Sequence, residues 1–146
     1  MVEFARNVLG FRDADHAETN PGAERLVVTP LACSLVGQTQ RVVLLSRTRA
    51  ARLYGAQEAT EDYYCNYGVN PDYRLRLEAS GLRVSGVGGE GEIRIVELPE
   101  HPFFMATLFL PQARSTAASP HPLIAGYAAA VAAGQPARRR LVTARP

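Results

Sequence analysis

The sequence predicts a mixed α/β fold built as a single domain. Short runs rich in β-branched residues, typical of strands, occur at residues 26–28, 41–45 and 92–98. They alternate with segments whose apolar residues recur at helical spacing, at residues 2–9, 72–80 and 122–133. The chain has 146 residues, of which 47% are hydrophobic, so it is long enough for one core but not for two domains.

Glycines mark where the predicted helices stop. Helices are expected at residues 2–9, 48–54 and 72–80, and they are followed by Gly10, Gly55 and Gly81. Glycine commonly ends a helix because it adopts the left-handed backbone conformation without a steric penalty.

A glycine-rich turn lies between two β-runs. Residues 86–91 read Gly-Val-Gly-Gly-Glu-Gly, between strands predicted at 82–84 and 92–98. The turn is like a phosphate-binding loop in glycine count alone, because the Gly-Lys-Ser/Thr ending and a following helix are missing. The pattern therefore predicts a β-hairpin.

The remaining segments complete the prediction. A polar surface loop is expected at 13–23, a strand at 63–67, a strand buried on both faces at 103–110 and an alanine-rich helix packing back on the sheet at 122–133. The predicted organisation is one domain over residues 1–134 and a basic, disordered tail over residues 135–146.

Composition argues against several classes of function. Four of the sixteen basic residues lie in the tail, so the formal net charge of +2 does not describe a basic folded surface, and no nucleic-acid partner is predicted. No apolar run approaches the length of about 20 residues that spans a membrane. No secretory leader is recognisable, and the two cysteines are far apart. A cytoplasmic protein without membrane association is expected.

One motif is specific enough to indicate a family. Residues 96–104 read Val-Glu-Leu-Pro-Glu-His-Pro-Phe-Phe and are followed by an apolar run that ends at Gln112. This stretch resembles the end of the class I glutamine amidotransferase domain of CTP synthases, where the strand ends in Gln-Phe-His-Pro-Glu. The His and Glu of that ending are the base and the orienting acid of the family's Cys-His-Glu triad.

The two matching positions of this chain carry residues that cannot do the same chemistry. Leu110 stands in place of the base and Gln112 in place of the acid. Leucine cannot take a proton from a thiol, and a neutral glutamine gives an imidazole no charge stabilisation. The resemblance therefore implies a degenerate triad, and no confident catalytic residue is assigned.

The resemblance extends over most of the chain. Residues 1–10 resemble the helix that follows the cysteine nucleophile in CTP synthases, residues 61–70 replace the basic segment Glu-Arg-His-Arg-His-Arg-Tyr-Glu-Val-Asn, and residues 119–123 match the start of the last helix. The implied fold is the C-terminal portion of a class I glutamine amidotransferase-like, flavodoxin-like three-layer α/β sandwich.

The chain is still more similar to the CTP synthase C-terminal region-related (seleno)proteins. Residues 33–37, 65–71 and 101–111 carry that similarity. Some members are thought to use selenocysteine, which makes Cys65 the candidate reactive thiol. From the sequence alone, a buried structural cysteine is the alternative. Cys33 and Cys65 are expected to be two buried free thiols, although a redox pair remains conceivable.

The segment that holds glutamine in CTP synthases has lost its arginines here. Tyr64 and Asn66 offer only neutral hydrogen bonds in place of a charged, bidentate clamp. Binding of free glutamine is therefore not expected, although both residues remain candidate contacts for another small molecule.

The histidines do not indicate a metal site. His16, His101 and His121 lack the short spacing of zinc ligands, and the two that precede prolines are expected to be structural. We predict no metal and no cofactor.

The chain also resembles only part of the family domain. The expected nucleophile falls upstream of the position that Met1 matches, which favours a fragment or an extended reading frame over a true half-domain. A half-domain would expose a parallel sheet edge and an apolar face, and it is expected to self-associate through that edge.

Three functions are compatible with the sequence. The favoured one is a catalytically degenerate amidotransferase homologue that acts as a small-molecule-binding or regulatory module without glutaminase activity. The second is a thiol-dependent enzyme that uses Cys65 as nucleophile or reductant. The third is a fragment of a CTP synthase that takes part in pyrimidine nucleotide biosynthesis.

Overall fold

The computed structural model describes residues 1–134, so the tail predicted at 135–146 lies outside the described residues. Its larger sheet has five antiparallel strands in the order β4 (Glu58–Tyr63), β3 (Gln38–Leu44), β6 (Arg83–Val87), β7 (Ile93–Glu97) and β8 (Met105–Thr107). A smaller sheet consists of β1 (Ala14–His16), β2 (Arg25–Pro30) and β5 (Tyr67–Val69), with β1 parallel and β5 antiparallel to β2.

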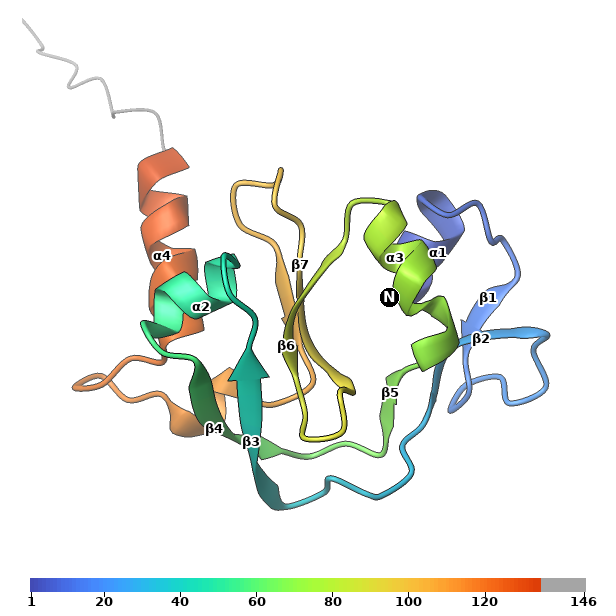
Figure 1. Ribbon diagram of the computed structural model, residues 1–146, viewed down its shortest axis with the longest axis horizontal. Helices are drawn as coiled ribbons and strands as arrows, with labels where there is room; N and C mark the ends of the chain where they lie inside the picture. The colour runs from blue at the N-terminus through green and yellow to red at the C-terminus, as the bar shows by residue number, and fades with distance from the viewer. Residues whose placement is uncertain (135–146) are drawn as a thin grey trace, which may run out of the picture.

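Helices lie on both sides of the larger sheet. They are α1 (Val2–Asn7), α2 (Arg49–Tyr54), α3 (Arg74–Ala79) and α4 (Pro122–Gly134), with 3₁₀ turns η1 (Pro71–Tyr73) and η2 (Pro111–Arg114). Figure 1 shows α2 and α4 together on one side of β6 and β7, and α1 and α3 on the other, next to the smaller sheet. Separate apolar clusters fill the two sides, one around Ile95 and Phe109 and the other around Leu77 and Val84.

Several elements follow the sequence prediction. The β-hairpin is confirmed, because β6 pairs with β7 in antiparallel register. Helix α2 ends at Gly55, which has a left-handed φ of 63° and returns its N–H to the carbonyl of Ala51. The alanine-rich helix is also confirmed as α4, although it packs chiefly against α2. Gly126 allows this approach, since a Cβ there would lie 2.6 Å from Leu53 Cδ2.

Three segments differ from the prediction. Residues 13–23 are not loop throughout, because β1 pairs with β2 and Ala14 is fully buried. Residues 63–67 do not form one strand: the chain leaves the larger sheet after Tyr63 and joins the smaller one at Tyr67. The strand expected at 103–110 shortens to β8, a partly exposed strand at the sheet edge, because pairing with β7 ends at Thr107 and Phe109 instead bridges to Tyr63 of β4.

Glu97 ties β7 to the start of α2. Its buried carboxylate accepts hydrogen bonds from the backbone N–H groups of Arg49, at 2.9 Å, and Ala50, at 3.1 Å. The Thr48 hydroxyl caps the same turn by accepting from the Ala51 N–H at 3.1 Å. The first turn of α2 contains no acidic residue of its own, so a strand distant in sequence supplies the negative charge that the positive end of the helix favours.

Among residues 1–134, no helix combines the length and the apolar character that crossing a membrane requires.

Helix α4 carries an apolar stripe on its outer face. Ile124, Tyr127 and Val131 are 38%, 57% and 43% exposed and follow helical spacing. Beside them a groove of about 320 Å³ runs between Phe103 and Tyr127 along the β8 edge. We propose that copies of the chain associate through this surface, although the exposed edge belongs to an antiparallel sheet and not to the expected parallel one.

Val131→Glu is expected to shift the protein toward monomer, because a charge in the stripe must be desolvated on association. Sedimentation velocity over a range of concentrations measures the shift. Ala129→Glu, an exposed position on another face of α4, is the matched control and is expected to leave association unchanged. A wild-type chain that stays monomeric at all concentrations would rule out the proposal.

Candidate functional site

The ends of β4 and β8 meet next to Leu110 and Gln112. Tyr63 and Phe109 form an isolated antiparallel bridge, and the Leu110 N–H donates to the Asp62 carbonyl at 2.9 Å. Leu110 then starts η2, which contains Gln112. The chain after β8 is thus hydrogen-bonded to the end of β4, and the side chains of Leu110 and Gln112 are exposed there.

A two-pronged ion pair fixes this turn. Arg114 of η2 donates to both carboxylate oxygens of Asp62, with Nε–Oδ2 at 3.0 Å and Nη2–Oδ1 at 3.1 Å. Thr39 donates to Asp62 as well, at 2.7 Å. The hydrogen bonds from Thr39 and Arg114 hold the pKa of Asp62 below its ordinary value. Leu110 and Gln112 therefore stand on a turn that these contacts hold in place.

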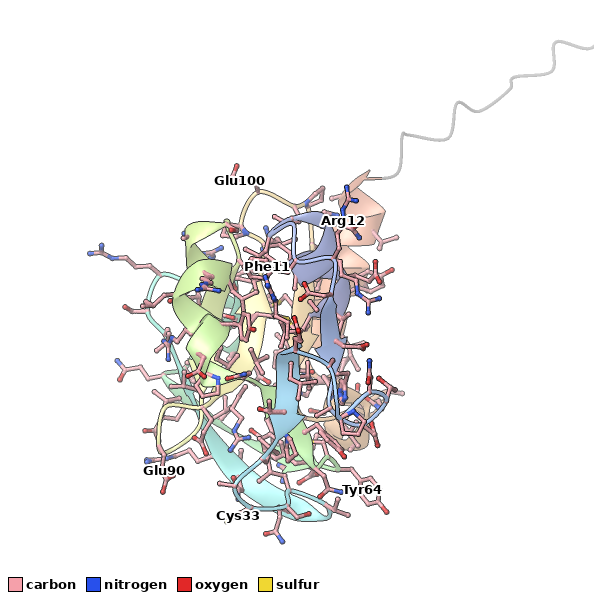
Figure 2. All side chains as sticks on the ribbon, turned by 90° about the vertical axis from the view of Figure 1, so that its right-hand side faces the viewer. Phe11, Arg12, Cys33, Tyr64, Glu90 and Glu100 are labelled. Carbon is pink, nitrogen blue, oxygen red and sulfur yellow. The ribbon has the colours of Figure 1, made fainter. Side chains whose placement is uncertain are left out.

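Tyr64, Cys65 and Asn66 form the link between the two sheets. Tyr64 is 69% exposed, and Figure 2 shows it at the periphery of the molecule. Asn66 is exposed too, whereas the Cys65 thiol turns inward and donates to the Leu108 carbonyl at 3.5 Å. The structure therefore brings Cys65 to the β8 strand end but directs Tyr64 and Asn66 toward solvent.

The two cysteines differ in environment. Burial raises the pKa of the Cys65 thiol, and the nearby positive charge of Arg94 opposes that rise. A thiol with a raised pKa is mostly protonated at neutral pH and is a weaker nucleophile, so a catalytic role for Cys65 remains a prediction. Cys33 is exposed, contrary to the expectation of two buried thiols, because it lies in the loop that follows β2. Both are free thiols.

Arg94 is a site residue that the sequence analysis missed. Its side chain is only 3% exposed, and its Nη2 donates to Glu92 Oε1 at 3.2 Å. Its Nε and Nη1 are buried and have no hydrogen-bond partner among residues 1–134. The guanidinium lies over the Tyr63 ring, with Cζ 5.2 Å from the centroid. The signal in the sequence was an arginine within the apolar run Ile93 to Val96.

Tyr63 is a second buried residue that lacks a hydrogen-bond partner. Its hydroxyl is buried and has no partner in the described part of the chain. Burial raises the pKa of Tyr63 to about 12, and the charge of Arg94 opposes the rise. Buried polar groups are almost always hydrogen-bonded in native proteins. Arg94 and Tyr63 are therefore neighbouring buried polar groups whose hydrogen bonding is incomplete within residues 1–134.

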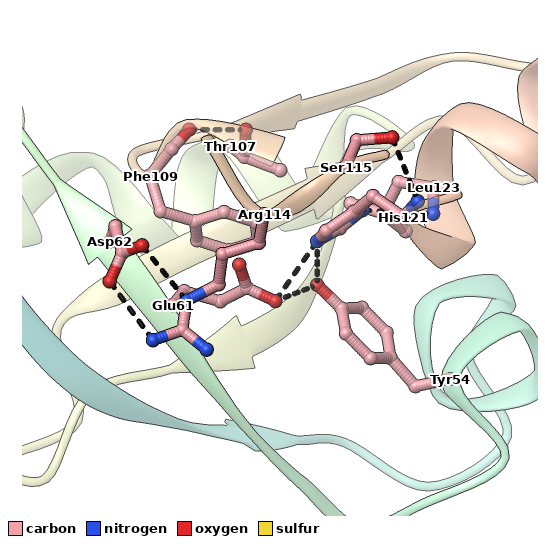
Figure 3. Close-up of polar contacts among 9 residues, drawn as sticks. All are labelled: Tyr54, Glu61, Asp62, Thr107, Phe109, Arg114, Ser115, His121 and Leu123. Atoms are coloured by element: carbon pink, nitrogen blue, oxygen red, sulfur yellow. Dashed lines mark hydrogen bonds and ion pairs between the residues drawn. The ribbon is translucent and has the colours of Figure 1, made fainter. Parts of the chain in front are cut away.

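A second buried polar cluster consists of Tyr54, Glu61 and His121. His121 Nε2 lies 3.0 Å from Glu61 Oε1, and the Tyr54 hydroxyl donates to the same oxygen at 2.5 Å (Figure 3). The His121 and Glu61 side chains are 3% and 2% exposed. The Tyr54 and Phe109 rings pack against the His121 ring and separate this His–Glu pair from solvent. The structural role expected for His121 remains a prediction that this burial supports.

The other histidines lie apart from these clusters. His16 ends β1 and its ring is 5.0 Å from that of Tyr67, and His101 is exposed before β8. In the described region, no group of three or more His, Cys, Asp or Glu side chains is placed to hold a metal ion.

Comparison with known proteins gives these features a context. No family model matches the chain. The chain is 38% identical over 141 residues to CTP synthase of Saccharolobus solfataricus, covering 90% of this chain and 26% of that protein. It is 39% identical over 145 residues to CTP synthase of Methanopyrus kandleri, covering 92% and 27%. The chain therefore spans about a quarter of the length of the curated relatives it matches.

Solved structures define the fold. The chain has a class I glutamine amidotransferase-like α/β fold, as predicted. Its structure matches the glutaminase domain of Trypanosoma brucei CTP synthase, which was solved with bound acivicin, at a TM-score of 0.85 and 27% identity over 92% of this chain and 56% of that one. A putative GMP synthase subunit from Thermoplasma acidophilum shares the fold at a TM-score of 0.53 and 14% identity, covering 73% of this chain and 48% of the other. The chain thus contains a CTP synthase-related glutamine amidotransferase-like domain.

Proposed function

We propose that this domain is a catalytically degenerate relative of the CTP synthase glutaminase domain, which binds a small molecule or regulates a partner and lacks glutaminase activity. The similarity to CTP synthases supports the relationship. Membership of the (seleno)protein branch is a further part of the proposal. It rests on the motifs that begin at Cys33, Cys65 and His101.

The observation that carries this proposal is the chemistry at the end of β8. Leu110 and Gln112 stand on a turn that Asp62 and Arg114 hold in place. Their side chains can neither accept a proton from a thiol nor stabilise an imidazolium. His121 is enclosed in the core and turned toward Glu61. The strand end therefore supports binding or architecture better than acyl transfer.

The expected result of a glutaminase assay is no release of ammonia from glutamine above the uncatalysed background. A CTP synthase assayed in parallel is the positive control. The protein is assayed both as this chain and with any upstream residues encoded in the same reading frame, so that a nucleophile supplied from there would be detected. Turnover of glutamine by either form would contradict the proposal.

A further inference from the structure

A cleft of about 340 Å³ opens between the β6–β7 turn and the loop that follows β2. Leu31 and Leu35 form its apolar wall, and Glu90 and Glu92 form its acidic rim, beside Arg94. Figure 2 shows Cys33 and Glu90 at the same end of the molecule, away from Glu100. The cleft lies at the opposite end of the sheet from the buried Glu97 cap.

Arg94 is the unsatisfied group of this cleft. Glu92 pairs with only one of its nitrogens, so the Nε and Nη1 nitrogens of a side chain that is 97% buried remain without an acceptor in residues 1–134. Gly88 makes the position accessible to the guanidinium, because a Cβ there would lie 2.8 Å from Arg94 Nε. An arginine held in this way costs stability unless an anion completes its hydrogen bonds.

The rest of the cleft narrows the class of that anion. The acidic rim of Glu90 and Glu92 repels a doubly charged phosphate more strongly than a singly charged carboxylate. The wall formed by Leu31 and Leu35 favours an apolar substituent. A carboxylate also matches the planar geometry of the guanidinium donors.

We infer that the cleft binds a small monocarboxylate, whose oxygens accept from Arg94 and whose apolar part lies against Leu31 and Leu35. This inference names the ligand class of the binding module proposed above and rests on that proposal. It is independent of the Leu110 strand end, because Leu110 and Gln112 do not line this cleft.

The experiment compares isobutyrate with isobutyramide, which has the same shape but no charge. Isobutyrate is expected to raise the melting temperature of the wild-type protein in a concentration-dependent manner, and isobutyramide is not. Arg94→Met is expected to weaken isobutyrate binding at least about tenfold, since it removes the charge-assisted hydrogen bonds. Without ligand, this variant is expected to be as stable as wild type or more so, because methionine fills the space without unpaired donors.

Arg12→Met is the matched control. Arg12 is exposed and lies at the other end of the molecule from Cys33 and Glu90 (Figure 2), so this variant loses the same charge but is expected to bind normally. A second readout is local: isobutyrate is expected to slow alkylation of Cys33 by iodoacetamide in a Cys65→Ser background, since Cys33 lines the cleft.

Three results would overturn the inference: no response of the wild-type protein to isobutyrate, equal binding by Arg94→Met, or a response to inorganic phosphate and not to isobutyrate. Destabilisation of unliganded Arg94→Met would indicate a structural arginine. None of these results involves ammonia release, so they are distinguishable from a failure of the proposed loss of glutaminase activity.

Discussion

Replacing Glu61 by alanine is expected to lower the free energy of unfolding by about 2–5 kcal/mol, because two buried hydrogen-bond donors lose their acceptor at about 1–3 kcal/mol each. Glu61 Oε1 accepts from both the Tyr54 hydroxyl and His121 Nε2. The substitution removes this shared acceptor from two largely buried donors and leaves them only their 3.2 Å contact with each other. Burial, followed by the hydrogen bond to Glu61, raises the pKa of Tyr54; because burial remains in the variant, the hydroxyl stays protonated and still needs an acceptor.

The hydrogen bonds of His121 define its proton arrangement. Its Nδ1 accepts from the Leu123 N–H at 3.2 Å, so the proton that reaches Glu61 must lie on Nε2. His121 directly precedes α4 and its own N–H donates to Ser115 at 3.0 Å. One imidazole therefore caps the first turn of α4 and joins that helix to β4. Loss of Glu61 is expected to loosen α4 as well as the core.

Urea denaturation followed by circular dichroism measures this effect, provided that the slope of the transition is unchanged. Glu61→Gln keeps a carbonyl oxygen that can accept from Tyr54 or His121, so it is expected to lower the free energy of unfolding by less than Glu61→Ala does. Because the two residues act as one unit, His121→Ala added to Glu61→Ala is expected to cost much less than the sum of the single changes. Glu58→Ala, in an exposed pair with Arg41, is the control and is expected to change stability by less than about 1 kcal/mol. A comparable loss in the control would contradict the assignment.

The elements that the sequence predicted are those with a local cause. Helix α2 stops where Gly55 provides a left-handed residue, and the hairpin turns at the glycines between β6 and β7. These signals lie within a few residues of the structure they determine. Strand β1 was missed because its pairing with β2 depends on contacts across the polar segment that separates them. Burial of Ala14 comes from packing, which no local pattern encodes.

In the candidate site, too, only the features with a local signal in the sequence were predicted. The motif around Leu110 and Gln112 identified the strand end, because a family resemblance needs only the order of residues. Arg94 was not found, since its significance lies in the absence of partners across the described fold. The exposure of Cys33 was also missed, because a loop and a buried strand are equally compatible with its apolar neighbours. Unsatisfied hydrogen bonds appear only when the residues distant in sequence have been placed.

Glu97→Ala is expected to destabilise the protein by about 3–4 kcal/mol, because two backbone N–H groups of α2 lose a charged acceptor inside the fold. Ala50 is fully buried, so water cannot replace the lost carboxylate oxygen there without opening the structure. Glu97 also lies 4.0 Å from Arg83, but that arginine is half-exposed and its contribution is small. The helix cap therefore dominates the expected loss.

This second prediction gives a physical reason for the most specific motif in the chain. Glu97 belongs to the motif at residues 96–104, and the backbone carbonyls of Pro99 and His101 in the same motif accept from the Arg49 side chain. The motif thus secures α2 twice, through its backbone and through its first side chain. Thr48→Ala removes only the local cap and is expected to cost about 1 kcal/mol. Chemical denaturation of both variants tests whether Glu97→Ala lowers the free energy of unfolding more than Thr48→Ala does. Equal losses of stability would show that β7 does not hold α2.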